Sequence, residues 1–429
     1  MSAVDVGTAA LPEVLDGFDL TDHTRFADGV PHEVFARLRR EAPVLRHPPG
    51  TSADGDPFWV LTRHADIVAA ASDPVFSTQG GPGRAGGGSH LEDLPAGVLA
   101  GVLIGMMDDP RHARMKDVLA PAMAGPAAAR YAERFADLAD ALVGGAVRAG
   151  RVDFMTDVSE LYAVRAIATV LGVPEADWPL LERWGADVLG FVNRRTGVVD
   201  DFSRATFQEM QRYFTDFVPA RRDDRAVDLG SALARGELAE GGPMTDRERE
   251  ANLALMFITG LEQPRNTFAG AVLTFAEHPE QWRLLREDRS LLPTAIEEVL
   301  RWNPPNPYNR RTATRDVELH DQVIRAGEKV TFWWPSANRD EAAFADPATV
   351  DITRNPNPHL SFGAGRHACL GAEVARRQIG IALEALLDRV EEIRLTGPVV
   401  HAPNNKHTVI LRMPVELVPA NASEPSTRK

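Results

Sequence analysis

The stretch FGAGRHACLG, from Phe362 to Gly371, contains the only cysteine in a chain of 429 residues. A lone cysteine cannot form an internal disulfide, a four-cysteine zinc site or an iron–sulfur cluster, because each of these needs several thiolates. The sequence therefore leaves an inert buried thiol, a nucleophile or a single thiolate ligand to a large cofactor. Gly363, Gly365 and Gly371 allow the backbone to approach a ligand closely.

The residues after this cysteine favour a thiolate over a thiol. GAEVARRQIGIALEALL, from Gly371, has the spacing of an amphipathic helix. The start of a helix presents backbone N–H groups and the positive end of the dipole to the sulfur, and both stabilise the charged form. This environment suits a metal ligand.

The elements that position this loop are predicted to be mostly helices. Helical spacing occurs over residues 31–43 and over most of the segment 111–301. Strand patterns are short and occur in FWVLT (58–62), DVELHDQVIRAGEKVTFWW (316–334) and KHTVILRMPVEL (406–417). The predicted fold class is mainly α with small β-sheets.

No linker rich in proline or serine divides these elements, so we predict one large domain over residues 19–418. Residues 1–18 and 419–429 lack clear periodicity and are predicted to be flexible. The stretch TQGGPGRAGGGSH (78–90) has the composition of a mobile loop.

The overall composition is ordinary for a soluble globular protein, with 44% hydrophobic and 25% charged residues. A net charge of −14 argues against a nucleic-acid binder. No stretch reaches the roughly 18 apolar residues of a membrane span, and no signal peptide opens the chain. We therefore expect a cytoplasmic protein, and a single cysteine is consistent with a reducing compartment.

A second constellation precedes the cysteine loop. Glu298 and Arg301 in EEVLRW are three residues apart and share one face of the predicted helix. Taken alone, such a pair is usually an exposed surface pair that contributes almost nothing. Here it is followed in order by RRTATRD (310–316), SANRDEAAF (336–344) and Arg354.

In this order the motifs closely resemble the haem-thiolate monooxygenases of the cytochrome P450 family. The resemblance covers roughly residues 19–417, is strongest over 298–377, and is closest to soluble bacterial members of actinobacterial type. It implies the cytochrome P450 fold, a single large domain with haem b between distal and proximal helices. It also implies that Cys369 is the axial thiolate of the haem iron, where it promotes O–O cleavage.

The resemblance assigns further residues around the cofactor. Phe362 would pack beside the thiolate loop, His367 would reach a haem propionate, and Gly371 would allow close approach. A buried network of one carboxylate and two guanidinium groups would hold the proximal side together. Its members are Glu298, Arg301 and Arg354. Loss of one member would leave a buried charge unpaired.

Other propionate contacts carry over with one departure. The family places a histidine four residues before an arginine, and in DDPRHARMK the histidine is His112 but the second residue is Lys116. Lysine keeps the charge and loses the bidentate geometry of arginine. Arg311 matches a propionate-binding arginine, whereas neighbouring Arg310 is equally well read as a solvated arginine.

The predicted distal helix also departs from the family pattern. It reads TGLEQPRN, so that Gly260 and the acid Glu262 are present, but Gln263 replaces the usual threonine and Pro264 follows. These are the candidate catalytic residues: Gly260, Glu262 and Gln263. Gln263 has no hydroxyl, so we expect protons to arrive through ordered water with Gln263, Glu262 or a polar group of the substrate. Pro264 removes an N–H donor and should bend the helix, to admit dioxygen and water or as a mere tolerated kink.

Substrate-facing positions follow only from the resemblance. The candidates are Leu261, Asn193, Tyr308, Asn309 and Asn404, and an exposed loop residue is an equal alternative for most of them. Likeness to members that oxidise terpenoids, steroids and other lipids favours a lipophilic substrate. The polar candidates favour a functionalised natural product, and both readings stay open.

The implied activity is insertion of one oxygen atom into an organic substrate, using dioxygen and two electrons. No reductase or flavin domain is visible, so a separate ferredoxin-type donor with an NAD(P)H-dependent reductase is expected. A basic patch would face that donor. Its members are Arg114, Lys116, Arg366, Arg376 and Arg377.

Three alternatives remain at this point. The unusual distal helix makes desaturation, ring formation or aryl coupling on the same centre plausible, and a peroxide-driven reaction is a further variant. The alternative of another class is a catalytically silent homologue that activates a partner enzyme. In such relatives the cysteine loop is lost, whereas here it is intact.

Overall fold

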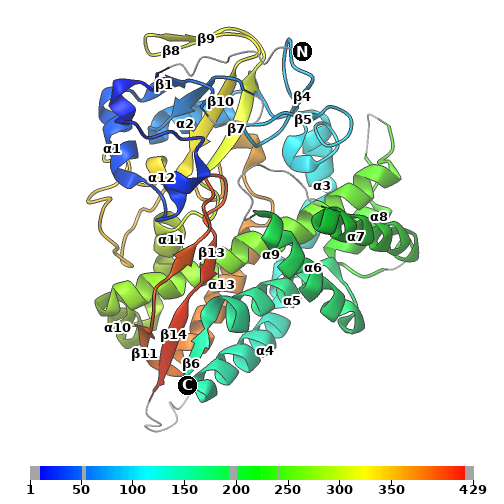
Figure 1. Ribbon diagram of the computed structural model, residues 1–429. Coiled ribbons are helices and arrows are strands. Elements are labelled where there is room, and N and C mark those ends of the chain that lie inside the picture. The colour runs from blue at the N-terminus through cyan, green and yellow to red at the C-terminus, as the bar shows by residue number, and fades with distance from the viewer. Residues whose placement is uncertain (1–9, 51–54, 193–200, 224, 239–241, 421–429) are drawn as a thin grey trace.

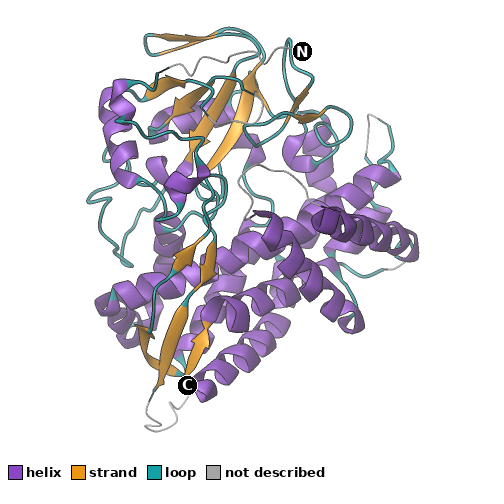
Figure 2. Cartoon of the chain, in the orientation of Figure 1, coloured by secondary structure: helices purple, strands orange, loops and turns teal. Residues whose placement is uncertain are grey.

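Helices form most of the chain that the computed structural model describes, which comprises residues 10–50, 55–192, 201–223, 225–238 and 242–420 (Figures 1 and 2). The α-helices are α1 (His32–Glu41), α2 (His64–Ser72), α3 (Arg111–Met123), α4 (Pro126–Ala149), α5 (Glu160–Leu171), α6 (Trp178–Val192), α7 (Asp201–Ala220), α8 (Leu229–Arg235), α9 (Asp246–Glu277), α10 (Pro279–Glu287), α11 (Leu292–Trp302), α12 (Trp334–Ala337) and α13 (Ala372–Leu387). Helix α9 crosses the middle of the helical part, and α5 and α13 pack against it.

The strands lie in two places in Figure 2, most of them above the helices and the rest lower, alongside the helical part. They are β1 (Val44–His47), β2 (Phe58–Leu61), β3 (Phe76–Ser77), β4 (Gly86–Gly87), β5 (Leu94–Pro95), β6 (Arg151–Asp153), β7 (Tyr308–Ala313), β8 (Val317–Leu319), β9 (Gln322–Ile324), β10 (Lys329–Trp333), β11 (Val390–Leu395), β12 (Val400–His401), β13 (Ile410–Arg412) and β14 (Pro414–Pro419). The largest sheet has the order β1-β2-β10-β7-β3, and β10 runs parallel to β2 and antiparallel to β7.

Helix α9 has a strong start signal. The Thr245 hydroxyl accepts the N–H of Glu248 at 3.2 Å, and the Glu248 carboxylate accepts the N–H of Thr245 at 2.8 Å, which is a capping box. The helix then continues across Pro264, although a proline has no N–H for the Gly260 carbonyl. Packing against α5 and α13 keeps this segment helical.

In the five-stranded sheet, β7 lies between β10 and β3. All five residues of β10 are buried, and the Trp333 ring packs between Phe35 and Tyr308, with ring centroids 5.0 and 4.9 Å away. Side chains alternate along a strand. Tyr308 therefore faces the side of the sheet opposite to Asn309 and Arg311.

The predicted fold class is confirmed: the chain is mainly α with small sheets, and each predicted strand region contains at least one strand. Strand β6 was not predicted, because it is a three-residue element inside the helical segment. It pairs with β14 from the end of the chain, a partner that no local pattern indicates.

The glycine-rich stretch 78–90 is packed rather than loose, contrary to the expectation from its composition. Strand β4 pairs with β5, and a Cβ added at Gly87 would lie 2.4 Å from the backbone of Gln79. Arg84 forms ion pairs with Asp56 at 2.6 Å and Asp93 at 2.5 Å. Gly80, Gly86 and Gly87 therefore allow close backbone contact in this stretch.

The ordered chain extends beyond the predicted limits of residues 19 and 418. Residues 1–9 and 421–429 lie outside the described residues, but Leu15 is fully buried and belongs to the cluster around Phe35 and Trp333. At the other end Pro419 pairs in β14, and Ala420 donates its N–H to the Arg389 carbonyl at 2.8 Å. Both predicted flexible segments were therefore too long at their inner ends.

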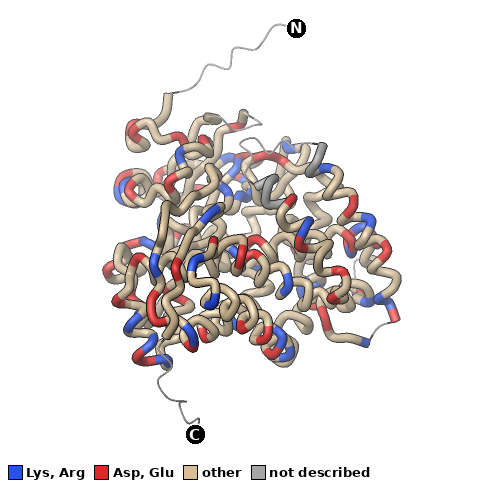
Figure 3. Tube along the Cα trace, turned by 60° about the horizontal axis from the view of Figure 1, so that its bottom comes forward, with Lys and Arg blue, Asp and Glu red and all other residues tan. Residues whose placement is uncertain are grey.

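Positively and negatively charged residues are interspersed along the described chain in Figure 3. Among the described residues, no helix combines the length and the apolar character that a membrane crossing requires.

Candidate active site

A cavity of about 420 Å³ lies between the distal helix α9, the cysteine loop and strand β7. Cys369 forms part of one wall, and Gly260 and Gln263 of α9 form part of another. Much of the remaining lining is apolar, including Ile104, Met106, Ile167, Val170 and Leu255. The cavity has the size and character of a small-molecule site.

The cysteine loop is held by backbone contacts that require glycine. Gly363 and Gly365 have φ of 72° and 66°, and a Cβ at Gly365 would lie 2.4 Å from the carbonyl oxygen of Ala71 at the end of α2. The Cys369 N–H donates to the Phe362 carbonyl at 2.8 Å. These contacts turn the Cys369 thiol into the cavity.

The surroundings of Cys369 act on the pKa of its thiol in opposite directions. Burial raises the pKa of Cys369, and this effect exceeds the lowering by the Gly371 N–H, Lys116 and Arg376. The helix start and the cations are present as expected.

The predicted propionate-binding residues gather on one side of the cavity. Arg311, His112, Lys116 and His367 all line it. The rings of His112 and His367 have centroids 4.0 Å apart, and burial lowers the pKa of His367 to about 3. Lys116 donates to the carbonyls of Arg366 at 3.0 Å and Ala368 at 3.4 Å, which ties α3 to the cysteine loop.

Arg311 is only 6% exposed, and burial lowers its pKa to about 10. Its Nη1 donates to the Arg310 carbonyl at 2.9 Å, and its guanidinium carbon lies 5.7 Å from the centre of the Phe332 ring. No ion pair joins it to a carboxylate in the part of the chain that the structure describes. A buried, unpaired guanidinium at a cavity wall indicates that an anion binds there.

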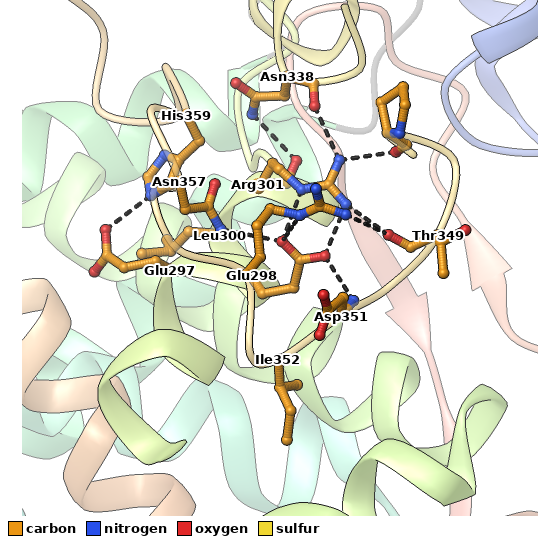
Figure 4. A network of polar contacts seen from close by, with 12 residues as sticks. Glu297, Glu298, Leu300, Arg301, Asn338, Thr349, Asp351, Ile352, Asn357 and His359 are labelled. Atoms are coloured by element: carbon orange, nitrogen blue, oxygen red, sulfur yellow. Dashed lines mark hydrogen bonds and ion pairs between the residues drawn. The ribbon is translucent and has the colours of Figure 1, made fainter. Parts of the chain in front are cut away.

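The predicted network of Glu298, Arg301 and Arg354 is assembled, and Figure 4 shows Glu298 and Arg301 with several of their partners. The side chains of Glu298 and Arg301 are fully buried, and Arg301 donates to both oxygens of Glu298, at 2.7 and 2.8 Å. Arg354 Nε donates to the same carboxylate at 3.1 Å, Asn357 Nδ2 at 3.0 Å and the Asp351 N–H at 2.8 Å.

Every donor of Arg301 in this network has an acceptor. Its remaining N–H groups reach the carbonyls of Asn338 at 3.0 Å, Pro347 at 2.8 Å and Thr349 at 2.9 Å. The network thus ties α11 to the chain that leads into the cysteine loop, and it leaves no charge unpaired.

The distal helix presents the predicted residues in different ways. A Cβ at Gly260 would lie 2.4 Å from Ile167 Cδ1, so this glycine allows α9 to pack closely on α5. Gln263 and Pro264 line the cavity. Glu262 is 3% exposed, and burial raises its pKa to about 7, against the opposing effects of Arg265 and Lys406.

A turn from the C-terminal part of the chain meets this helix. His407 Nδ1 lies 3.3 Å from Glu262 Oε1, and Gln263 Nε2 lies 3.4 Å from the same nitrogen. Burial keeps the pKa of His407 well below its ordinary value. We call the polar groups at this meeting point the distal corner. They are His90, Glu262, Gln263, Lys406 and His407.

Comparison with known proteins identifies the family. The model described as Cytochrome P450 matches residues 151–414. The chain belongs to the cytochrome P450 family. It is 38% identical to "Putative cytochrome P450 126" of Mycobacterium tuberculosis over 94% of this chain and 98% of that one. It is 31% identical to "Linalool 8-monooxygenase" of Pseudomonas putida, over 94% and 99%.

A solved P450 structure shows the same fold over nearly the whole chain. The crystal structure of CYP108D1 from Novosphingobium aromaticivorans matches with a TM-score of 0.83 at 26% identity, and covers 96% of this chain and 99% of that one. The predicted family and enzyme class are therefore confirmed: this is a P450 oxidoreductase, and the cofactor of the family is haem.

The residues present fit a haem. Haem b carries two carboxylates and an iron with an open axial position, and the P450 cavity offers a thiol on one wall and a buried unpaired guanidinium on another. A Cβ at Gly371 would lie 3.1 Å from Met123 Cε and 4.0 Å from Cys369 Sγ, so the glycine keeps space around the sulfur.

Most of the predicted substrate-pocket residues do not line the cavity. Only Asn309 lines the P450 cavity. Tyr308 points to the opposite side of β7 and packs on Trp333, and Leu261 is buried beside Gly185 of α6. Asn404 accepts the N–H groups of Lys406 at 2.7 Å and His407 at 3.1 Å, which makes it a turn residue. Asn193 lies outside the described residues.

Sequence reasoning missed three residues of the distal corner: His90, Lys406 and His407. All three line the cavity. A signal was present, because NNKH is a polar run at the edge of a predicted strand region, but only Asn404 was singled out from it. The contact between His407 and Glu262 spans 145 positions of sequence, which spacing along the chain cannot indicate.

Proposed function

We propose that Cys369 ligates the haem iron and that this P450 inserts one atom of dioxygen into a lipophilic organic substrate. The observation that carries the proposal is the Cys369 thiol, which opens into a largely apolar cavity beside buried cations. Thiolate-bound haem supplies the redox chemistry that activates dioxygen. The protein contributes binding, orientation and proton delivery.

The cations of the cavity wall would hold the propionates. Arg311 is buried and charged, and Lys116 and His112 lie beside it on α3. His367 would donate to a propionate through a ring nitrogen, since its lowered pKa keeps the ring neutral. Phe362 lines the cavity together with Cys369 and packs against the guanidinium of Arg376, whose carbon lies 4.5 Å from the ring centre.

Proton delivery would run through the contact of Glu262, His407 and Gln263. Burial raises the pKa of Glu262 to about 7, which suits a group that takes up and releases protons near neutral pH. His407 places a neutral ring beside both Glu262 and Gln263, so the relay does not need the alcohol that is absent from α9. Water in the cavity would complete the path.

Replacing the glutamine tests this path. For Gln263→Ala we expect the yield of product per NADPH consumed to fall by about tenfold or more, because one proton-handling group is lost. Gln322→Ala, on the exposed β9, is the control. Unchanged coupling in Gln263→Ala would refute the proposed path.

A lipophilic substrate is supported by the apolar lining and by the relative named for oxidising linalool. The polar groups of the distal corner support a substrate that also carries a functional group. Spin-state shifts in the absorption spectrum, recorded with terpenoid, steroid and polar natural-product panels, would choose between these classes.

The electron donor is proposed to be a ferredoxin that docks near the start of α13. The predicted basic patch is only partly available, because Arg376 makes a bidentate ion pair with Glu297 and Arg366 pairs with Asp109. Arg377 is exposed, and no ion pair engages it within the described residues. A reductase that uses NAD(P)H would supply the ferredoxin.

The absorption spectrum of the reduced protein under carbon monoxide tests the core of the proposal. We expect a strongly red-shifted Soret band that is absent from Cys369→Ala, because only a thiolate ligand produces it. Protein without haem, or haem without that band, would refute the assignment and favour a catalytically silent partner protein. Product formation with a surrogate ferredoxin and reductase would exclude the silent alternative.

A further inference from the structure

Lys406 is a buried cation at the cavity that the proposed reaction does not use. It is 5% exposed, lines the cavity and follows the turn residue Asn404, whose side chain accepts its N–H. The turn is fixed on both sides, because Asn405 Nδ2 donates to the Leu20 carbonyl at 2.9 Å and the Thr408 N–H donates to the Pro305 carbonyl at 3.0 Å. The position of the lysine is therefore set by the fold.

The ammonium group of Lys406 is incompletely paired. It donates to the Tyr308 carbonyl, and Nζ lies 4.6 Å from the centre of the Tyr308 ring. An ammonium group has three N–H donors. Within the described part of the chain, no ion pair joins Lys406 to a carboxylate, and the charges that face it are Arg311, Glu262 and Glu92.

Burial without a counter-charge is costly for a lysine. The pKa of Lys406 falls to about 7, mainly through burial and next through Arg311. Lys329 offers a comparison in the same chain, because it is equally buried but forms an ion pair with Asp56 at 3.3 Å. A fold that positions a buried cation at a cavity and leaves it without an anion indicates that the anion comes from a ligand.

The surroundings of Lys406 suit a carboxylate. The His90 ring lines the same region of the cavity, and burial lowers its pKa to about 3, so the ring is neutral and has one N–H to donate. The apolar part of the wall, formed by residues such as Ile167, Val170 and Leu255, is available to a hydrocarbon.

We propose that Lys406 binds the carboxylate of an amphiphilic substrate whose hydrocarbon part fills the apolar region of the cavity. This inference rests on the proposed monooxygenase function and names its substrate class. The carboxylate is fixed at the turn 404–408, while the chain extends along the distal helix. Lys406 thus selects which end of the substrate is held and which part is oxidised.

A second carboxylate source has to be separated from the first, because the haem propionates are also carboxylates. Arg311, His112, Lys116 and His367 offer donors for both propionates on the wall that includes α3. Lys406 belongs to the C-terminal turn and to the distal corner. The experiment therefore measures haem retention as well as substrate binding.

The test compares an acid with its ester. Haem-loaded enzyme, at a pH just below neutral, is titrated with dodecanoic acid and methyl dodecanoate, and the dissociation constants are taken from the Soret shift. We expect the acid to bind about tenfold or more tightly than the ester, since a charge-assisted hydrogen bond is lost in the ester. In Lys406→Met the two constants should become nearly equal, with ester binding retained.

Lys329→Met is the matched control, because it removes a buried lysine that has its own carboxylate partner and does not line the cavity. It should keep the preference for the acid. Equal binding of acid and ester by the wild type, an acid preference that persists in Lys406→Met, or no shift with octanoic, dodecanoic or hexadecanoic acid would each overturn the inference.

Haem content separates the remaining outcomes. If Lys406→Met retains less haem than the wild type and its remaining haem-loaded fraction keeps the acid preference, the carboxylate at Lys406 is a propionate and the substrate assignment is wrong. A wild type that lacks the red-shifted band under carbon monoxide contradicts the proposed function itself, and that result is distinct from any change in the acid-to-ester ratio.

Discussion

The Glu298 network and the distal corner are both buried groups of charged side chains, but they are satisfied to different extents. In the network, both oxygens of Glu298 and all donors of Arg301 have partners. In the distal corner, Glu262 Oε1 has no hydrogen-bond donor and Lys406 has no ion-pair partner within the described residues. A satisfied group holds the chain in place, whereas an unsatisfied group marks where a ligand, a proton or water has to bind.

The strongest way to break this contrast is to remove the shared carboxylate. Glu298→Gln would leave the buried guanidinium of Arg301 without its counter-charge, so we expect a loss of about 3–5 kcal/mol in the free energy of unfolding. Urea denaturation of the haem-loaded protein measures it. Glu392→Gln, at an exposed pair with Arg394, should change little. Equal losses in the two variants would show that the network is not structural.

For the distal corner, we expect the free energy of unfolding to depend on pH through Glu262. Burial raises the pKa of Glu262 from 4.5 to about 7, so its stabilising contribution is present below the unfolded pKa and is lost as the pH rises through the folded one. Glu262→Gln removes this loss of stability with rising pH, because glutamine does not ionise. From a pH of about 5 to about 8, the free energy of unfolding should shift in favour of the variant by up to about 3 kcal/mol. A difference that stays constant over this range contradicts the prediction.

A smaller effect should follow from adding a methyl group where α9 packs closely on α5. In Gly260→Ala the new Cβ would meet Ile167, and we expect a loss of about 1–3 kcal/mol in the free energy of unfolding. Gly145→Ala is the control, because its nearest neighbour lies 3.9 Å away and alanine favours the interior of α4. It should stabilise the protein slightly. A gain in both variants would mean that the glycine at 260 is not needed for packing.

The smallest effect is expected at the surface, where the same contrast between paired and unpaired charge recurs. Arg376 is engaged by Glu297, whereas Arg377 is exposed without an ion pair among the described residues. Arg377→Glu should slow electron transfer from ferredoxin by about threefold to tenfold at low salt, and the difference should fade as salt is added. Stopped-flow reduction measures the rate, with Arg325→Glu as control. Equal slowing in both would argue against a docking site at Arg377.

Sequence reasoning succeeded where the signal was local or motif-bound. The cysteine loop, Glu298 with Arg301, and the cavity residues His112, Lys116 and Arg311 were predicted because their types and order match a specific family pattern. The structure brings each of them to the cavity or to the network beside it.

Sequence reasoning failed where the direction of a side chain, or a contact between distant parts of the chain, determines which residues face the cavity. Tyr308 and Asn309 are neighbours in sequence, yet only Asn309 faces the cavity, because the register of β7 against β10 sets which residue points inward. Lys406 and His407 were overlooked for a related reason. They matter because His407 contacts α9 and Lys406 contacts β7, and the neighbouring sequence indicates neither contact.

The bond from Asn405 to the carbonyl of Leu20 joins positions 385 residues apart. During synthesis the loop of Cys369 leaves the ribosome before the turn that bears Lys406. Leu20, the N-terminal partner of this turn, has left the ribosome earlier still. The residues of the distal corner can therefore come together only after the turn 404–408 has been synthesised. A chain stopped shortly before Asn404 would retain its thiol and the Glu298 network but lack the lysine that we assign to substrate selection.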